Sequence, residues 1–438
     1  MPARGAEHEH LIDRAEQLMG GSPGAFKLPA EHAIVIERGI GSKVYDVDGN
    51  EYIDYLMGSG PMLIGHAHPQ VVEAVQHQAA RGSTFYTLTK QSIELAERLV
   101  EAIPCADSVK YVSSGTEATF HAMRIARTYT GKPKILKFEG GFHGVNDYSL
   151  MSSMASRPTE YPRPIPDSAG IPGEIEADVL VSRWNDSALT AEILAEYGDQ
   201  IAAVICEPLQ RALIAAPGFL QDLRDMTSKH NVLLIFDEIV TGFRLAYGGA
   251  QERYGVIPDM ATYGKAMAGG YPLAAVAGRR EIMDVTRPER RGSSPVAHLG
   301  GTMNGNPLAA SAGLATLNVL SGDGVYDQLY DTANKLKDGL RAIADESGEQ
   351  VRIIGEGPVF QIFFTETAPS DYPGVLQTDR ARSRQFGLNL IKRGFYLNPG
   401  EKFYISLAHD QGDVDTTLVA AREAMMELSG VAKTVASN

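Results

Sequence analysis

Short apolar runs alternate with helical stretches through the middle of the chain, and this pattern constrains the fold more than any other feature. The runs of strand length are 108–112, 134–138, 202–206, 232–237, 260–263 and 274–277. Their alternation with helices predicts an α/β domain with a large, mostly parallel sheet. Ligands of such sheets bind beyond the carboxyl ends of the strands, so we expect functional residues directly after the runs.

The chain has 438 residues, which at about 100–200 residues per domain suffices for two or three domains. We expect a large sheet domain and a small α+β domain that takes residues from both ends of the chain. The expected boundaries are 1–69, 70–320 and 321–438. In the first segment, Asp48-Gly49-Asn50 is a strong hairpin signal. The stretch 152–173 is rich in Pro, Ser and Gly, which indicates a long loop of the kind that often forms a lid.

The charge balance excludes some classes of partner. With 40 Lys+Arg against 54 Asp+Glu, the net charge is −14, which argues against nucleic-acid binding but permits a local basic pocket for a small anion. No apolar run approaches the roughly 20 residues of a membrane helix, so no membrane partner is expected. Two cysteines, Cys105 and Cys206, form neither a disulfide framework nor a C-x-x-C pair, and the start of the chain lacks the apolar segment of a signal peptide. We therefore expect a cytoplasmic protein.

Two ionisable residues follow strand-like runs in the second half of the sheet domain. Asp237 ends the run 232–237, where a carboxylate either lies at the sheet edge or simply caps a turn. Lys265 follows the run 260–263 within a glycine-rich segment, and it is either a buried amine or an ordinary surface lysine. Either residue alone is a weak signal.

Three glycine-rich segments complete the pattern. Residues 113–118, Ser-Ser-Gly-Thr-Glu-Ala, precede a helix and predict either an anion cradle or a simple helix cap. Phe142, after two glycines at a strand end, can stack on a planar ring or pack in the core. Residues 300–306 form a third glycine-rich turn. An anion cradle, an aromatic plate, a carboxylate and a lysine are together what pyridoxal phosphate requires.

These motifs resemble those of the class III (ω-type) aminotransferases, which have pyridoxal phosphate-dependent fold type I, and most of all the glutamate-1-semialdehyde 2,1-aminomutase branch. The resemblance extends from about residue 11 to 427. It rests on VYDVDGNEYIDY (44–55), GHAHP (65–69), SSGTEA (113–118), FEGGFHG (138–144), LIFDEIVTGFR (234–244), GKAMAGG (264–270) and GGTMNGNPLA (300–309).

The resemblance implies a role for each matching residue. Lys265 would hold the cofactor aldehyde as a Schiff base and shuttle protons, and Asp237 would pair with the pyridine nitrogen. Ser114, Gly115 and Thr116 would bind the phosphate, and Gly301 and Thr302 would reach it from the partner subunit of a homodimer. Phe142 and Ile239 would cover the ring faces, and Gln210 would reach the ring 3-oxygen. The remaining expected cofactor-binding residues are Ser114, Gly115, Thr116, Phe142, His143, Glu207, Gln210, Ile239, Gly301 and Thr302.

The chain departs from the aminomutase pattern where that branch binds its substrate. Ser22-Pro23-Gly24-Ala25-Phe26 lacks the carboxylate-binding arginine of the S-P-V-R-A-F motif, and Gly58-Ser59-Gly60-Pro61 lacks the tryptophan of S-W-G-P. Arg211-Ala212 follows Gln210 where the branch has a nearby Gly-Asn pair. Arg157, Arg163 and Arg211 either compensate for the lost arginine or are solvated loop residues.

These departures favour an aminotransferase that takes an amino group from an amine or amino acid donor and passes it to a carbonyl acceptor by a ping-pong mechanism. We expect a bulky amine or a β-amino acid as donor. The alternatives are an intramolecular aminomutase and a non-catalytic binding protein of the same fold. No metal is expected: His66 and His68 are poorly spaced for one, and His8 and His10 are expected to be solvated.

Overall fold

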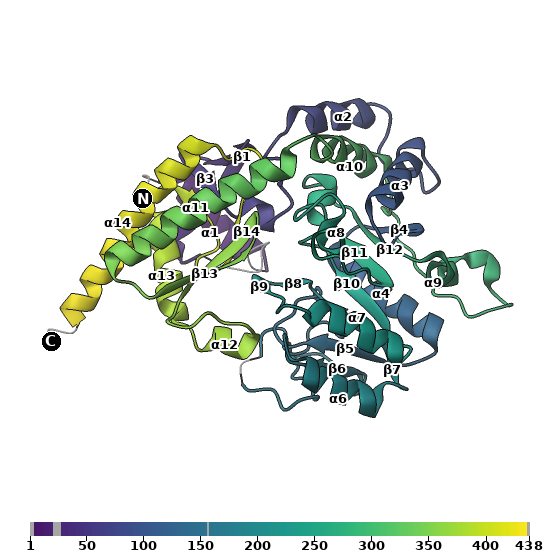
Figure 1. Ribbon diagram of the computed structural model, residues 1–438. Helices are drawn as coiled ribbons and strands as arrows, with labels where there is room; N and C mark the ends of the chain where they lie inside the picture. Colours follow the sequence, from purple (N-terminus) through teal and green to yellow (C-terminus); the bar gives the residue numbers. More distant parts are fainter. Residues whose placement is uncertain (1–3, 21–27, 156, 436–438) are drawn as a thin grey trace. The chain divides into compact units, whose positions relative to one another are not determined.

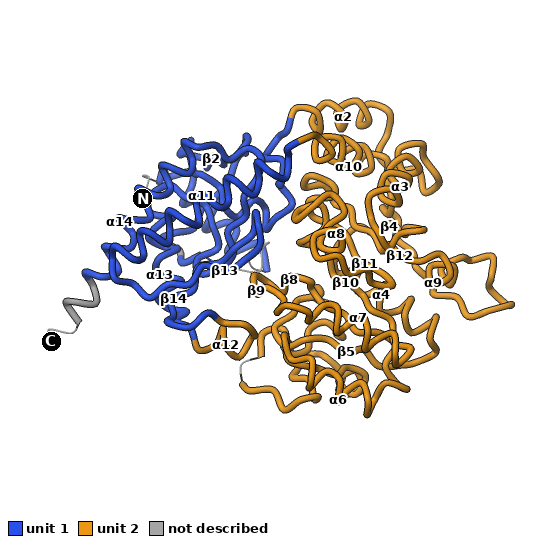
Figure 2. The backbone as a smooth tube through the Cα atoms, in the orientation of Figure 1, with its two compact units in different colours: residues 1–68, 324–368, 378–438 blue, residues 69–323, 369–377 orange. Residues whose placement is uncertain are grey.

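The structure is a computed structural model that describes residues 4–20, 28–155 and 157–435 (Figure 1). The chain divides into two compact units (Figure 2). The small unit comprises residues 1–68, 324–368 and 378–438, and the large unit comprises residues 69–323 and 369–377. No helix among the described residues is both long and apolar enough to span a bilayer.

A seven-stranded sheet forms the centre of the large unit, in the order β4-β12-β11-β10-β7-β5-β6. Strand β12 runs antiparallel to both of its neighbours, β4 and β11, and the other pairs of this described sheet are parallel. The strands are β4 (Ser108–Val112), β5 (Lys134–Phe138), β6 (Val179–Ser182), β7 (Ile201–Cys206), β10 (Leu233–Asp237), β11 (Met260–Tyr263) and β12 (Ala274–Gly278). The predicted mostly parallel α/β fold is confirmed. The sequence analysis missed only β6 of these strands, whose four residues follow the long loop.

Helices and two minor strands accompany this sheet. They are α2 (Pro69–Ala79), α3 (Lys90–Ala102), α4 (Gly115–Thr130), α5 (Gly173–Glu176), α6 (Ser187–Tyr197), β8 (Leu209–Gln210), β9 (Leu213–Ile214), α7 (Phe219–Lys229), α8 (Gly249–Tyr254), α9 (Arg280–Met283), α10 (Pro307–Leu320) and α12 (Tyr372–Leu376). Helix α4 packs one face against the sheet, with Ala122 and Ile125 in the same core cluster as Ile205 and Ile235. Since β10 is buried along its whole length, its apolar run fits a central parallel strand.

The small unit joins both ends of the chain in one core. Strand β15 (Phe395–Tyr396) pairs in parallel with β3 (Glu51–Asp54), next to the hairpin of β1 (Ile36–Ile40) and β2 (Lys43–Asp46). Tyr55 packs against Phe403 at a ring separation of 5.4 Å, so segments from both ends share the interior. The other elements are α1 (Ala6–Leu18), α11 (Val325–Ser347), β13 (Val351–Glu356), β14 (Val359–Phe364), α13 (Arg380–Ile391), β16 (Phe403–Tyr404) and α14 (Gln411–Val435).

Candidate active site

Asp237 occupies the carboxyl end of the central strand β10 and is only 4% exposed. Its Oδ2 lies 2.7 Å from Nδ1 of His143. Its Oδ1 accepts hydrogen bonds from the Ile239 amide (3.1 Å) and the Thr262 hydroxyl (3.2 Å). An ionised carboxylate only accepts, so Nδ1 of His143 carries a proton and the carboxylate is held in a fixed orientation at the sheet edge.

Two buried polar atoms without a hydrogen-bond partner lie beside Gly141. His143 Nε2 and Gln210 Oε1 are both buried with no hydrogen bond within the described structure. A Cβ atom added to Gly141 would lie 3.3 Å from His143 Nε2 and 3.4 Å from Gln210 Oε1. Buried polar atoms are nearly always paired, so these two indicate a place for a polar ligand or an ordered water.

Lys265 lies beyond the end of the neighbouring strand β11 and starts a short 3-10 helix, Lys265–Ala268. Strand register pairs Asp237 with Thr262, three residues before this lysine, so both ionisable groups belong to the same edge of the sheet. Lys265 is half-buried and has a φ of 43°, which is unusual for a residue with a side chain. Such strain concentrates at functional sites, and here it accompanies the turn that places the lysine.

The start of α4 combines a helix cap with free amides. Ser114 Oγ accepts from the Glu117 amide (3.2 Å), while the Glu117 carboxylate accepts from the amides of Ser113 and Ser114. Within the described residues, nothing accepts from the amides of Gly115 and Thr116, which are the first two of the helix. The helix cap is therefore present, and the free amides beside it are of the kind that binds anions.

Glu207 connects two loops next to this edge. Its Oε1 accepts from the Phe142 amide (2.8 Å) and its Oε2 from the Arg211 amide (3.3 Å). Phe142 is half-buried, which leaves part of its ring accessible. Ile239 packs against the start of α4, where its Cγ2 would lie 3.2 Å from a Cβ added to Gly115. The backbone of Phe142 is therefore fixed by a carboxylate that follows strand β7.

The remaining predicted residues, Gly301 and Thr302, are exposed. In the described part of the chain no hydrogen bond joins them to the groups around Asp237. Their segment does approach α4, since Asn304 Oδ1 accepts from the Ser113 hydroxyl at 3.1 Å. The structure thus gathers the predicted residues of strands β5, β7, β10 and β11 along one sheet edge, while these two stay apart from them.

Two residues near the site were not predicted from the sequence. Thr262, which donates to Asp237, stands at the facing register position on β11, and strand pairing alone would have revealed it. Glu139 accepts at its carbonyl from Gln210 Nε2 (2.8 Å), and its carboxylate binds the hydroxyls of Thr159 and Tyr161. Glu139 therefore anchors the long loop that the sequence predicts over 152–173, a contact that sequence patterns do not indicate.

Two further buried charges in this unit serve the fold. Glu238 accepts five hydrogen bonds, from Thr241, Ala250, Gln251 (twice) and Tyr263, and burial raises the pKa of its carboxyl group. Lys137 donates from Nζ to three oxygen atoms, those of Ser149, Met151 and Ser153. Burial lowers the pKa of Lys137 to about 7. With every position occupied, neither group is available to a ligand.

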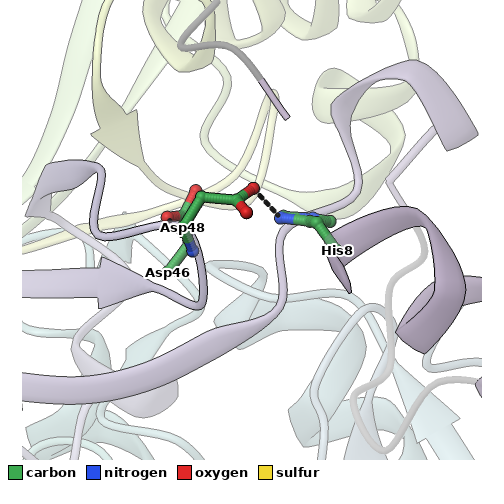
Figure 3. Close-up of side chains that lie close together, drawn as sticks. All are labelled: His8, Asp46 and Asp48. Atoms are coloured by element: carbon green, nitrogen blue, oxygen red, sulfur yellow. Dashed lines mark hydrogen bonds and ion pairs between the residues drawn. The ribbon is translucent and has the colours of Figure 1, made fainter. Parts of the chain in front are cut away.

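The small unit contains a cluster that superficially resembles a metal site. Ligand atoms of His8, Asp46 and Asp48 lie within 4.8 Å of one another (Figure 3). His8 is 1% exposed, so the expectation of a solvated side chain is wrong for it, whereas His10 is exposed. The Asp46 carboxylate already accepts four hydrogen bonds, from Asp48, Tyr52 and two groups of Asn50. The cluster anchors α1 to the hairpin turn. His66, in the same unit, forms a similar pair with Asp54 (2.7 Å).

The positions that depart from the aminomutase pattern fall in different places. Residues 22–26 lie outside the described residues. The segment 58–61 belongs to the small unit, where Ser59 and two glycines have positive φ. Of the three candidate arginines, Arg157 and Arg163 are exposed and Arg211 is half-buried.

Comparison with known proteins identifies the class. Residues 27–399 match the family model for class III aminotransferases, so the chain belongs to that family. It is 44% identical over 406 residues to the glutamate-1-semialdehyde 2,1-aminomutase of Pelotomaculum thermopropionicum, which covers 91% of this chain and 92% of that protein. The predicted resemblance is confirmed.

Solved structures agree with the assignment. An ω-transaminase from Sphaerobacter thermophilus superposes with a TM-score of 0.92 at 32% identity, covering 97% of this chain and 98% of that one. A transaminase with pyridoxal phosphate bound gives a TM-score of 0.89 at 27% identity, covering 98% and 99%. These relatives confirm fold type I and the expected cofactor of the family.

Proposed function

We propose that this chain is a pyridoxal phosphate-dependent enzyme that moves an amino group, and that its site is the sheet edge around Asp237 and Lys265. The unpaired buried atoms of His143 and Gln210, beside Gly141, carry the proposal. They lie near a carboxylate, a helix N-terminus with free amides and a strained lysine, which together suit the groups of this cofactor. When bound, the cofactor supplies an aldehyde that condenses with amines and a ring that accepts electrons.

Each residue then has a role that follows from its chemistry. Asp237, oriented by His143 and Thr262, holds negative charge at the site and favours a protonated ring nitrogen. With the cofactor bound, Lys265 Nζ would be the amine that holds its aldehyde, and as a free amine it would accept a proton from the substrate. The amides of Gly115 and Thr116 and the Ser114 segment would hold the phosphate, and Phe142 and Ile239 would lie against the ring.

Gly301 and Thr302, which are exposed on the large unit, would serve the site of a second copy of the chain. The active enzyme is then a homodimer in which each copy completes the phosphate site of the other. This assignment follows from the family resemblance at residues 300–309. The substrates are small molecules that carry an amine or a carbonyl group.

Transfer within one molecule is the reaction that the named sequence relatives support best. The relative from Pelotomaculum thermopropionicum, 44% identical over nearly the whole chain, is a glutamate-1-semialdehyde 2,1-aminomutase. The second candidate is transfer between a donor and an acceptor. It is favoured by the similarity to an ω-transaminase at a TM-score of 0.92 and by the loss of the arginine and tryptophan expected near residues 25 and 59.

One assay separates the candidates. Purified enzyme is given glutamate-1-semialdehyde alone or a panel of amine donors with a keto acid acceptor. An aminomutase converts the single substrate without any co-substrate. A transferase shows parallel lines in double-reciprocal plots of the donor and acceptor pair. Failure of both reactions, in protein that has taken up the cofactor, would instead support a non-catalytic binding protein.

The lysine assignment has its own test. Borohydride reduction of cofactor-loaded protein should label the peptide that contains Lys265, and Lys265→Ala should abolish the label without changing the circular dichroism spectrum. An adduct on a different lysine would refute the assignment. Lys137, buried in the same unit but bonded to three acceptors, is the internal comparison and should stay unlabelled.

A further inference from the structure

Arg211 occupies an unusual backbone position next to the site. The hairpin of β8 and β9 pairs Gln210 with Leu213, so Arg211 and Ala212 are its two turn residues. Arg211 has a φ of 60°, in the left-handed region that two-residue hairpin turns usually assign to Asn or Gly. An arginine is neither favoured nor needed for this turn, and strained backbone of this kind is concentrated at functional sites.

Three contacts hold this arginine against the proposed ring plate. Its amide donates to Glu207 Oε2 (3.3 Å), and its Nε donates to the Gly140 carbonyl (3.1 Å). Its guanidinium carbon lies 5.1 Å from the centroid of the Phe142 ring, a cation–π distance. Glu207 also fixes the Phe142 amide, so one carboxylate positions both the plate and the arginine.

The guanidinium group of Arg211 still has donors available for a further acceptor. Among the residues that the structure describes, no carboxylate forms an ion pair with Arg211, although the side chain is half-buried. Nε is used, which leaves the terminal Nη1 and Nη2 groups for a further acceptor. A guanidinium matches a carboxylate with two parallel hydrogen bonds, and such charge-assisted pairs are strong.

We propose that Arg211 binds the carboxylate group of an acidic substrate beside Phe142. The inference rests on the proposed function and specifies its substrate class: an amino acid or keto acid whose carboxylate lies apart from the reacting carbon. Arg211 thereby takes over the role of the arginine that the 22–26 motif lacks. It is a specificity-determining residue, since amines without a carboxylate have nothing to gain from it.

Binding of inert ligands tests the proposal without turnover. We would titrate the cofactor-loaded enzyme with 3-phenylpropionate and glutarate, which carry no amine, and with the neutral 3-phenylpropionamide, by calorimetry. Arg211→Gln should weaken carboxylate binding roughly 10- to 100-fold and leave the amide unchanged. Arg211→Lys should bind the carboxylates with an affinity between those of wild type and Arg211→Gln. An ammonium group keeps the charge but does not form two parallel hydrogen bonds. Arg163→Gln, at an exposed arginine of the same unit, is the matched control and should change neither.

Kinetics provide the second readout. For a β-amino acid donor, kcat/KM should fall by a similar factor in Arg211→Gln, while the donor that lacks only the carboxylate should be unaffected. Equal losses of kcat/KM for both donors would mean that Arg211 only positions Phe142, and this result would overturn the proposal. So would wild-type enzyme that fails to bind either carboxylate. Failure of the wider functional proposal is distinguishable, because the borohydride label at Lys265 would then be absent from wild-type protein.

Discussion

Two histidine–carboxylate pairs, one taken from each unit, each contain a buried histidine and differ in what its second nitrogen contacts. His143 Nδ1 lies 2.7 Å from Asp237 in the large unit, and His8 Nδ1 lies 3.1 Å from Asp48 in the small unit. The second nitrogen of His8 is 3.3 Å from the Ala33 carbonyl, whereas that of His143 is buried without a described partner. Both ring nitrogens of His8 therefore have a partner, whereas His143 Nε2 is left for a polar ligand or an ordered water.

Adjacent carboxylates at the end of β10 show the same contrast. Asp237 binds a histidine whose Nε2 has no partner in the described structure, while Glu238, the next residue, is buried and accepts five hydrogen bonds. Successive strand residues point to opposite faces, so one sequence dipeptide supplies a ligand-binding group and a structural one. Burial and charge alone therefore do not separate Asp237 from Glu238; the two differ in whether a neighbouring hydrogen-bond position is left unoccupied.

Replacing each of the two aspartates by asparagine tests the comparison most strongly. Asp237→Asn should lower kcat/KM about 1000-fold, about 4 kcal/mol of transition-state stabilisation, because the charge opposite the ring nitrogen is lost. Asp48→Asn removes a carboxylate from the other pair and should leave kcat/KM unchanged. Steady-state kinetics would measure both, with the substrate that the assay of the two candidate reactions identifies. Comparable losses in the two variants would mean that the Asp237 pair is structural as well.

Glu238→Ala tests the saturated member of the dipeptide. The substitution strands five donors in the interior, and we expect the free energy of unfolding to fall by about 3 kcal/mol or more. Urea denaturation followed by circular dichroism would measure it. Asp237→Ala, which strands fewer donors, is the control and should cost less stability but more activity. The reverse order would contradict the division between a structural and a functional carboxylate.

The sheet strands can be predicted from the sequence, whereas several residues of the site cannot. The strands at 134–138 and 260–263 follow from apolar runs, because burial on both faces of a sheet requires them. Thr262 and Glu139 did not follow, since their roles arise from strand register and from a loop contact that no local pattern encodes. His8 was misjudged for the same reason: nothing in its neighbourhood along the chain shows that the turn at Asp48 covers it.

Lys137, the buried lysine that serves the fold, allows a pH-dependent test. The pKa of Lys137 is lowered to about 7 in the folded chain, against 10.5 for an ordinary lysine. Between these values the unfolded chain binds more protons, so stability should rise as pH increases above 7. We expect a gain of about 2 kcal/mol between pH 7 and 9 in wild type relative to Lys137→Met, which lacks the titrating group. Urea unfolding at several pH values measures the difference, and parallel pH profiles would disprove it.

The mildest prediction concerns the saturated histidine. His8→Leu keeps an apolar body of similar size but removes the bonds to Asp48 and Ala33, and it should cost about 1 kcal/mol of unfolding free energy. Asp48 still accepts from the Gly5 amide (2.9 Å), so the loss should remain local, as faster amide hydrogen exchange in α1. Activity should not change, whereas His143→Leu should reduce activity and shift its pH profile with little loss of stability. If His8→Leu altered catalysis, or if His143→Leu acted only on stability, an unpaired buried nitrogen would no longer distinguish a ligand site from an anchor in this fold.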